Sequence, residues 1–127
     1  QVFERIDPRS PTPLYAQIAA RLRVAIATGE LRPAAALPSV RELAAALRIN
    51  PAPVIQAYRD LETARFVEIR QGAGTFVREL APGRRSRERA RQARSLVRRL
   101  MNEARRAGVS LHELRDAIDA EIGVAAS

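Results

Sequence analysis

Arginine is the side chain whose chemistry dominates this sequence. All 22 basic residues are arginine, against 14 acidic residues, and the formal net charge is +8. A guanidinium group can donate paired hydrogen bonds to a phosphate, or to O6 and N7 of guanine. A chain this basic attracts polyanions, and nucleic acid is the first partner to consider.

The groups that most enzymes and metal sites use are nearly absent. The sequence has no cysteine and a single histidine, His112. No nucleophile, base and orienting group occur at a recognisable spacing, and a lone histidine makes a poor metal site. We therefore expect no enzymatic activity, no cofactor and no bound metal.

The sequence also favours a cytosolic protein without a membrane partner. Arginine interrupts the apolar runs, so none approaches the ~20 residues that a membrane span needs, and no secretory signal is recognisable at the start. A chain without cysteine fits a reducing compartment.

The elements that would position the arginines begin with one amphipathic helix. Apolar residues recur at helical spacing from Leu14 to Ile26, and Gly29 supplies a left-handed stop. Thr12 is expected to cap this helix, with Pro13 at its first position. Residues 1–13 are expected to form an extended arm.

Two short helices with a tight turn between them follow. Ser39 and Glu42 form a capping box that would open the first. After the three-residue break of residues 48–50, Asn50 is expected to cap the second helix, with Pro51 at its first position. The pattern predicts a helix-turn-helix, whose second helix is built to enter a major groove.

A β-hairpin is expected directly after these helices. Residues 66–69 and 75–77 have strand character, and the glycine-rich residues 70–74 favour a tight turn. A hairpin in this place is the wing of a winged helix-turn-helix. The predicted fold is therefore mainly α with a small β-hairpin: a DNA-binding domain over residues 1–80 and a helical segment over residues 81–127.

The helical segment is expected to pair two chains. Ala81–Gly83 is the linker, and two amphipathic helices follow, the second opened by a capping box at Ser110 and Glu113. Helices of this length cannot enclose a core alone and need a partner surface, either the domain itself or a second chain. The residues expected to form a homodimer are Leu96, Val97, Leu100, Met101, Leu111, Leu114, Ile118 and Ile122.

Several segments together resemble the GntR family of bacterial transcription regulators, in its order and spacing over residues 10–78. These segments are Pro13–Tyr15 with Gln17–Ile18, Gly29–Pro33, Leu37–Ala44, Ala57–Glu62 and Gln71–Val77. The short helical tail is similar to the YtrA-type subfamily, in which such a segment dimerises and no large effector domain exists. The resemblance implies a dimeric repressor that binds an inverted-repeat operator in double-stranded DNA, while a small-molecule effector is left unidentified.

The resemblance also implies which residues touch DNA. The arginine after Pro-Ser-Val commonly reads a base in this family, and here it is Arg41. The start of the recognition helix and the wing supply the other contacts, although this chain has apolar Ala52, Pro53 and Ile55 where relatives commonly have polar readers. The expected DNA-binding residues are Ser39, Arg41, Asn50, Pro51, Ala52, Pro53, Gln56, Arg59, Arg70, Gln71 and Gly72.

Some alternatives stay open at the level of sequence. Tyr15 and Tyr58 could stack on bases, but both fall at positions expected to face the core, and packing is the interpretation we prefer. Residues 84–106 hold ten arginines against two glutamates, and could track DNA or form a solvated helix face. The chain could also be a general nucleic-acid-binding protein, or the DNA-binding fragment of a longer effector-responsive regulator.

Overall fold

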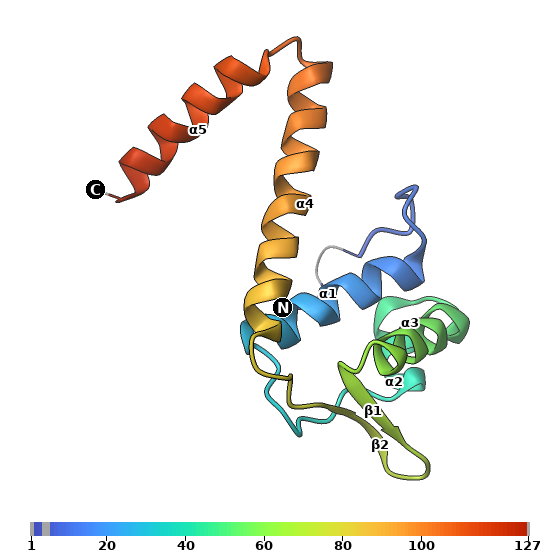
Figure 1. The fold of residues 1–127 in the computed structure, drawn as a ribbon. Coiled ribbons are helices and arrows are strands. Elements are labelled where there is room, and N and C mark those ends of the chain that lie inside the picture. Colours follow the sequence, from blue (N-terminus) through green and yellow to red (C-terminus); the bar gives the residue numbers. More distant parts are fainter. Residues whose placement is uncertain (1, 4–5, 127) are drawn as a thin grey trace. The chain divides into compact units, whose positions relative to one another are not determined.

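Three short helices, one hairpin and two longer helices follow one another in the computed structural model, which describes residues 2–3 and 6–126 (Figure 1). Their order confirms the predicted fold class. The chain divides into two compact units, and the boundary in the sequence falls between Arg89 and Ala90. The elements are α1 (Leu14–Thr28), α2 (Val40–Leu47), α3 (Pro51–Thr63), β1 (Val67–Arg70), β2 (Gly74–Val77), α4 (Arg84–Arg106) and α5 (Leu111–Ala126).

The ends of α1 confirm one expectation and correct another. Gly29 adopts the left-handed conformation, with φ 86°, and ends the helix as predicted. The predicted Thr12 cap is wrong, because Pro13 occupies the capping position and no side chain bonds there. The Gln17 amide holds the arm instead: it donates to the carbonyl oxygens of Asp7 and Thr12, each at 2.8 Å.

The helix-turn-helix forms with the predicted caps. Ser39 Oγ accepts a hydrogen bond from the backbone of Glu42 at 3.0 Å, and the Glu42 carboxylate accepts one from the backbone of Ser39 at 2.8 Å. Left-handed Arg48, with φ 57°, ends α2. Asn50 Oδ1 then accepts from the backbone N–H of Ala52 at 3.0 Å and opens α3. These local bonds fix where both helices begin.

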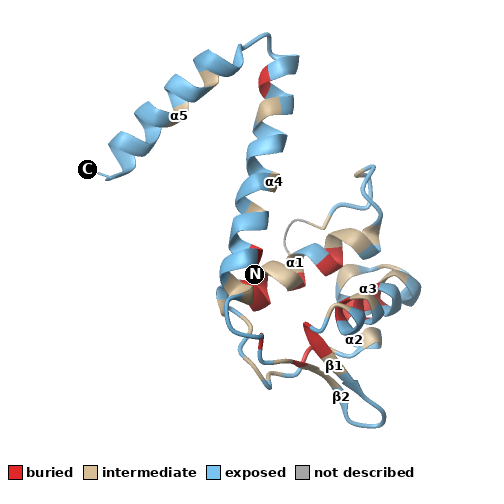
Figure 2. Ribbon diagram, viewed as in Figure 1, coloured by how far each residue is buried: buried red, intermediate tan, exposed pale blue. Residues whose placement is uncertain are grey.

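The core of the first unit lies mainly between α1 and α3, where the buried segments gather in Figure 2. Tyr58 is 2% exposed, which confirms its predicted packing role. Tyr15 is 40% exposed, so the same prediction for Tyr15 is wrong. Among the buried side chains are Ile18, Leu22, Ile26, Leu43, Val54, Ala57, Leu61, Phe66, Val67 and Val77.

The wing is tied to the segment that leads into α2. β1 and β2 pair antiparallel, with Val67 opposite Val77 and Arg70 opposite Gly74. Ala36 forms a further bridge with Phe76, and the Leu37 N–H donates to the Thr75 carbonyl at 2.8 Å. The start of α2 and the wing are therefore held side by side.

The first turn of α4 belongs to the first unit. Phe66 is buried, and the guanidinium carbons of Arg23 and Arg84 lie 5.3 Å and 4.2 Å from its ring centroid. Such cation–π contacts are stronger where the cation is shielded from water. Glu88 is 8% exposed, and its Oε1 lies 4.0 Å from Nε of Arg84. These contacts anchor the base of α4.

The second unit contains the rest of α4 and all of α5. Gly108, with φ 75°, lies in the turn after α4. The predicted capping box forms, with Ser110 Oγ accepting from the Glu113 backbone at 3.1 Å and the Glu113 carboxylate accepting from the Ser110 backbone at 3.0 Å. None of the described helices combines the length and the hydrophobicity that a membrane-spanning segment requires.

Candidate nucleic-acid interface

An open groove runs between the start of α2 and the wing. Ser39, Val40 and Glu42 line one side, and residues 69–75 line the other. The predicted contact residues Ser39, Arg70, Gln71 and Gly72, which are far apart in the sequence, therefore lie around one groove. Backbone pairing between the segment before α2 and β2 holds this arrangement.

The outward face of α3 carries another group of predicted contacts. Ala52, Gln56 and Arg59 are exposed, together with Ile55. Their spacing places them on one face of the helix, opposite the buried residues Val54, Ala57, Tyr58 and Leu61. The predicted α3 contacts are therefore available to a partner, except that Pro53 is half-buried at the flank.

Two of the predicted contacts, Arg41 and Arg59, are exposed and have no counter-ion among the described residues. Arg41, in the first turn of α2, and Arg59, on the outward face of α3, are both exposed. No ion pair or hydrogen bond joins the side chain of either one to another of the residues described by the structure. An arginine without a carboxylate partner keeps its paired donors for an external acceptor.

Arg70 is held by the wing itself. Its guanidinium forms an ion pair with Glu68, and its carbon atom lies 4.6 Å from the centroid of the Phe76 ring. The hydrogen bond from Arg70 and its positive charge lower the pKa of Glu68, and Arg78 contributes to this shift. Arg70 is therefore oriented by its neighbours, with part of its charge compensated.

A shallow hollow beside the outward face of α3 was not predicted. Pro13, Leu14 and Tyr15 line it from the α1 side, and Ala52, Pro53 and Gln56 line it from α3. The exposure of Tyr15 could have been expected from the spacing of the buried residues Ile18, Leu22 and Ile26. Tyr15 comes three residues before Ile18, which places it at the edge of the buried face of α1. Tyr15 joins the candidate interface.

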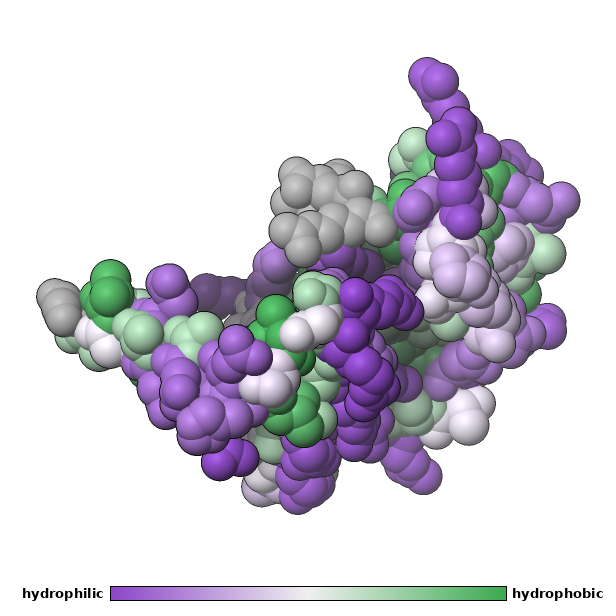
Figure 3. All heavy atoms as spheres, turned by 90° about the horizontal axis from the view of Figure 1, so that it is seen from above, coloured by the Kyte–Doolittle hydropathy of each residue, from purple (hydrophilic) through white to green (hydrophobic). Residues whose placement is uncertain are grey.

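The second unit exposes apolar side chains. Leu96, Val97, Leu100, Leu111 and Ile122 are all exposed, and no residue of α5 is buried. Figure 3, coloured by hydropathy, shows hydrophobic side chains lying open among hydrophilic ones.

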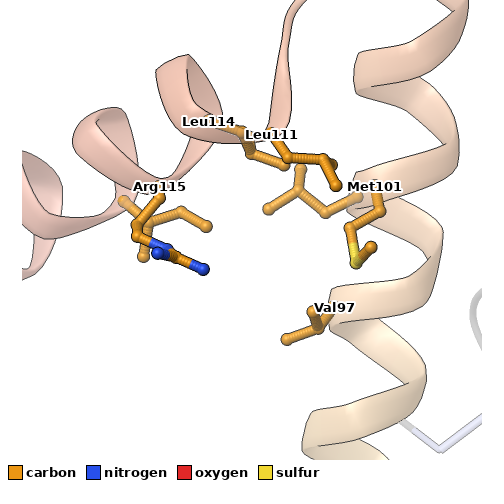
Figure 4. Close-up of a pocket in the computed structure, with 7 residues that line it drawn as sticks. Val97, Met101, Leu111, Leu114 and Arg115 are labelled. Carbon is orange, nitrogen blue, oxygen red and sulfur yellow. The ribbon is translucent and has the colours of Figure 1, made fainter.

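Within this unit, α4 and α5 form a pocket of about 190 Å³ (Figure 4). Its lining includes six of the eight residues predicted to dimerise. The full lining is Val97, Leu100, Met101, Leu111, Leu114, Arg115 and Ile118.

Comparisons with known proteins agree with this arrangement. Residues 14–77 match the family model described as bacterial regulatory proteins, gntR family. The chain is 36% identical over 112 residues to the HTH-type transcriptional repressor YtrA of Bacillus subtilis. The matched residues cover 88% of this chain and 86% of that protein.

Two solved structures extend the likeness. A GntR family transcriptional regulator from Listeria monocytogenes superposes with a TM-score of 0.68 at 27% identity, covering 87% of this chain and 96% of that one. YtrA from Sulfolobus acidocaldarius, a GntR-family transcription factor, superposes with a TM-score of 0.57 at 36% identity, covering 73% of this chain and 96% of that one. This chain belongs to the GntR family of bacterial regulatory proteins and is a DNA-binding transcription regulator of the YtrA type.

Proposed function

We propose that this protein is a cytosolic, dimeric repressor that binds an inverted-repeat operator. The observation that carries the proposal is that the first unit exposes Arg41 and the outward face of α3, together with the groove between the start of α2 and the wing. Occupying an operator blocks transcription without a catalytic step, so the proposed function requires no enzymatic activity.

The proposed contacts divide by chemistry. Arg41 reads a guanine through two parallel hydrogen bonds. Ser39, Asn50, Gln71 and Gly72 bind the sugar–phosphate backbone and fix the orientation of the domain.

The proposed dimer uses the apolar face of α4 and α5. A soluble monomer rarely leaves a large contiguous apolar patch in water, and Leu96, Leu100, Leu111 and Ile122 are all exposed. Burial of such a surface contributes roughly 25 cal/mol per Å². A two-fold axis then supplies two recognition helices for successive major grooves, with half-site centres about 10 base pairs apart or a multiple of that.

A second candidate is general nucleic-acid binding by residues 84–106. The ten arginines of this segment favour it, because phosphate neutralisation alone gives affinity for any duplex. This candidate predicts no preferred sequence.

Selection from genomic fragments separates the two candidates. Fragments retained by the full chain are sequenced after washing with excess random duplex, and transcription is then measured from a promoter that carries the enriched site. The repressor proposal expects one enriched inverted repeat and reduced transcription. Retention of all fragments in proportion to their abundance would favour general binding instead.

A further inference from the structure

Apolar side chains occupy part of the outward face of α3. Ala52 is exposed, and Ile55, which is 37% exposed, is not among the hydrophobic residues that form the core cluster or pack against it. The other exposed members of this face are Gln56 and Arg59.

The two amides near this face are already partly used. Asn50 Oδ1 accepts the capping bond from the Ala52 N–H, and Gln56 Nε2 donates to Asp60 Oδ1 at 2.8 Å. An amide reads adenine by offering its oxygen and its nitrogen together. Each amide is thus held by one bond within the protein, and Ala52 and Ile55 are the exposed apolar side chains beside them.

The major groove presents one apolar group, the C5 methyl of thymine. We propose that Ala52 and Ile55 read thymine methyl groups, one or two in each half-site of the operator. This inference rests on the proposed repressor function and names the base chemistry that the recognition helix selects.

The charges around Ile55 favour DNA over an apolar protein as the occupant. Arg59 lies one turn further along the same face and is exposed. The nearby carboxylates are engaged within the protein, Asp60 by Gln56 and Glu62 by the backbone N–H of Ile69 at 2.8 Å. An apolar patch beside a cation that forms no ion pair among the described residues suits a methyl group on a polyanion.

Uracil provides the test, because it pairs as thymine does and lacks only the methyl group. Each thymine of one half-site of the selected operator is replaced in turn by uracil, and dissociation constants are measured for the full chain. Burial of one carbon is worth about 0.8 kcal/mol, or roughly fourfold in affinity. We expect this fourfold loss of affinity at one or two thymine positions and no loss of affinity at the others.

Substitutions at Ile55 assign the effect to this residue. Ile55→Ser should bind thymine and uracil operators equally at the affected position, whereas Ile55→Val, which keeps an apolar surface, should retain most of the discrimination. Because Ile55 is exposed, both variants should fold, which circular dichroism checks. Tyr15→Ala is the matched control: Tyr15 lies at the flank of α3, and its loss should weaken binding to thymine and uracil operators by the same factor.

Two results would overturn the inference while leaving the repressor proposal intact. One is an unchanged affinity when every thymine is replaced in turn. The other is full discrimination by Ile55→Ser at every position where uracil weakens binding of the wild type. Failure of the repressor proposal looks different, because no enriched operator would be found at all.

Discussion

The Tyr58 hydroxyl donates a 2.7 Å hydrogen bond to the carbonyl oxygen of Pro38. This bond joins the middle of α3 to the residue just before the α2 cap, so the two helices of the helix-turn-helix are held together from inside. Burial, with a smaller effect from the charge of Glu42, raises the pKa of the Tyr58 hydroxyl. The group therefore remains a donor over the whole neutral range.

Tyr58→Phe removes this bond and keeps the ring in the core. We expect a loss of about 1 kcal/mol in the free energy of unfolding, as for a typical internal hydrogen bond, measured by urea denaturation. Tyr15→Phe is the control, because Tyr15 is exposed and its hydroxyl carries no comparable bond among the described residues. Equal stability of Tyr58→Phe and wild type would mean that the bond does not secure α3.

Arg41→Ala removes the proposed guanine contact. Specific binding should weaken by roughly 1–3 kcal/mol and preference should relax at one position of each half-site, as expected for a lost bidentate pair. Fluorescence anisotropy on operator and random duplexes measures both effects. Equal weakening on the two duplexes would make Arg41 a phosphate contact instead.

Gly72→Val tests the conformation of the wing. Gly72 has φ 76°, a region that β-branched residues avoid, while the space around its Cβ position is open. The substitution should reshape the turn and weaken operator binding without unfolding the domain. Gly72→Asn is the matched control, since asparagine tolerates this region more readily. Undiminished affinity in Gly72→Val would remove the wing turn from the interface.

The capping box of α2 should respond to acid. Hydrogen bonds from the Ser39 backbone and then from its side chain lower the pKa of Glu42 below its ordinary value of 4.5. A lowered pKa in the folded state means that the stabilisation is present above the unfolded value and is lost as the pH falls through the folded one. The stability difference between wild type and Glu42→Gln should therefore shrink below pH 4.5. Denaturation curves at several pH values measure it, and a difference that stays constant would contradict it.

A truncation after Arg89 tests the role of the helical segment. It keeps Arg84 and Glu88, which anchor the base of α4 to the first unit, and removes the apolar face of α4 and α5. Sedimentation should find a folded monomer, with operator affinity far below that of the full chain because two linked half-sites gain from effective concentration. A truncated chain that is still a dimer would place the interface in the first unit.

Much of this architecture follows from local patterns. The capping boxes at Ser39 and Ser110, the Asn50 cap and the Gly29 stop each depend on a few neighbouring residues, and all four form. The Thr12 cap failed because Pro13 took the capping position and the Gln17 amide bound the arm instead, a competition that spacing alone does not reveal.

Contacts between distant segments were beyond the reach of the sequence. The pairing of Phe66 with Arg23 and Arg84 depends on how α1, the residue before β1 and the first turn of α4 pack together. The exposure of Tyr15 depends on where α3 lies beside α1. Two of the predicted DNA contacts also bind a neighbouring side chain: Arg70 forms an ion pair with Glu68, and Gln56 donates a hydrogen bond to Asp60. Helix and strand periodicity do not determine these side-chain conformations.

Hydroxyl-radical footprinting of the full chain on its selected operator tests the central claim most directly, because it records which sugars of each strand the protein covers. A dimeric repressor predicts two protected blocks related by two-fold symmetry, centred about 10 base pairs apart or a multiple of that. A single asymmetric block, or uniform weak protection along the fragment, would contradict the account of a symmetric dimer reading an inverted repeat.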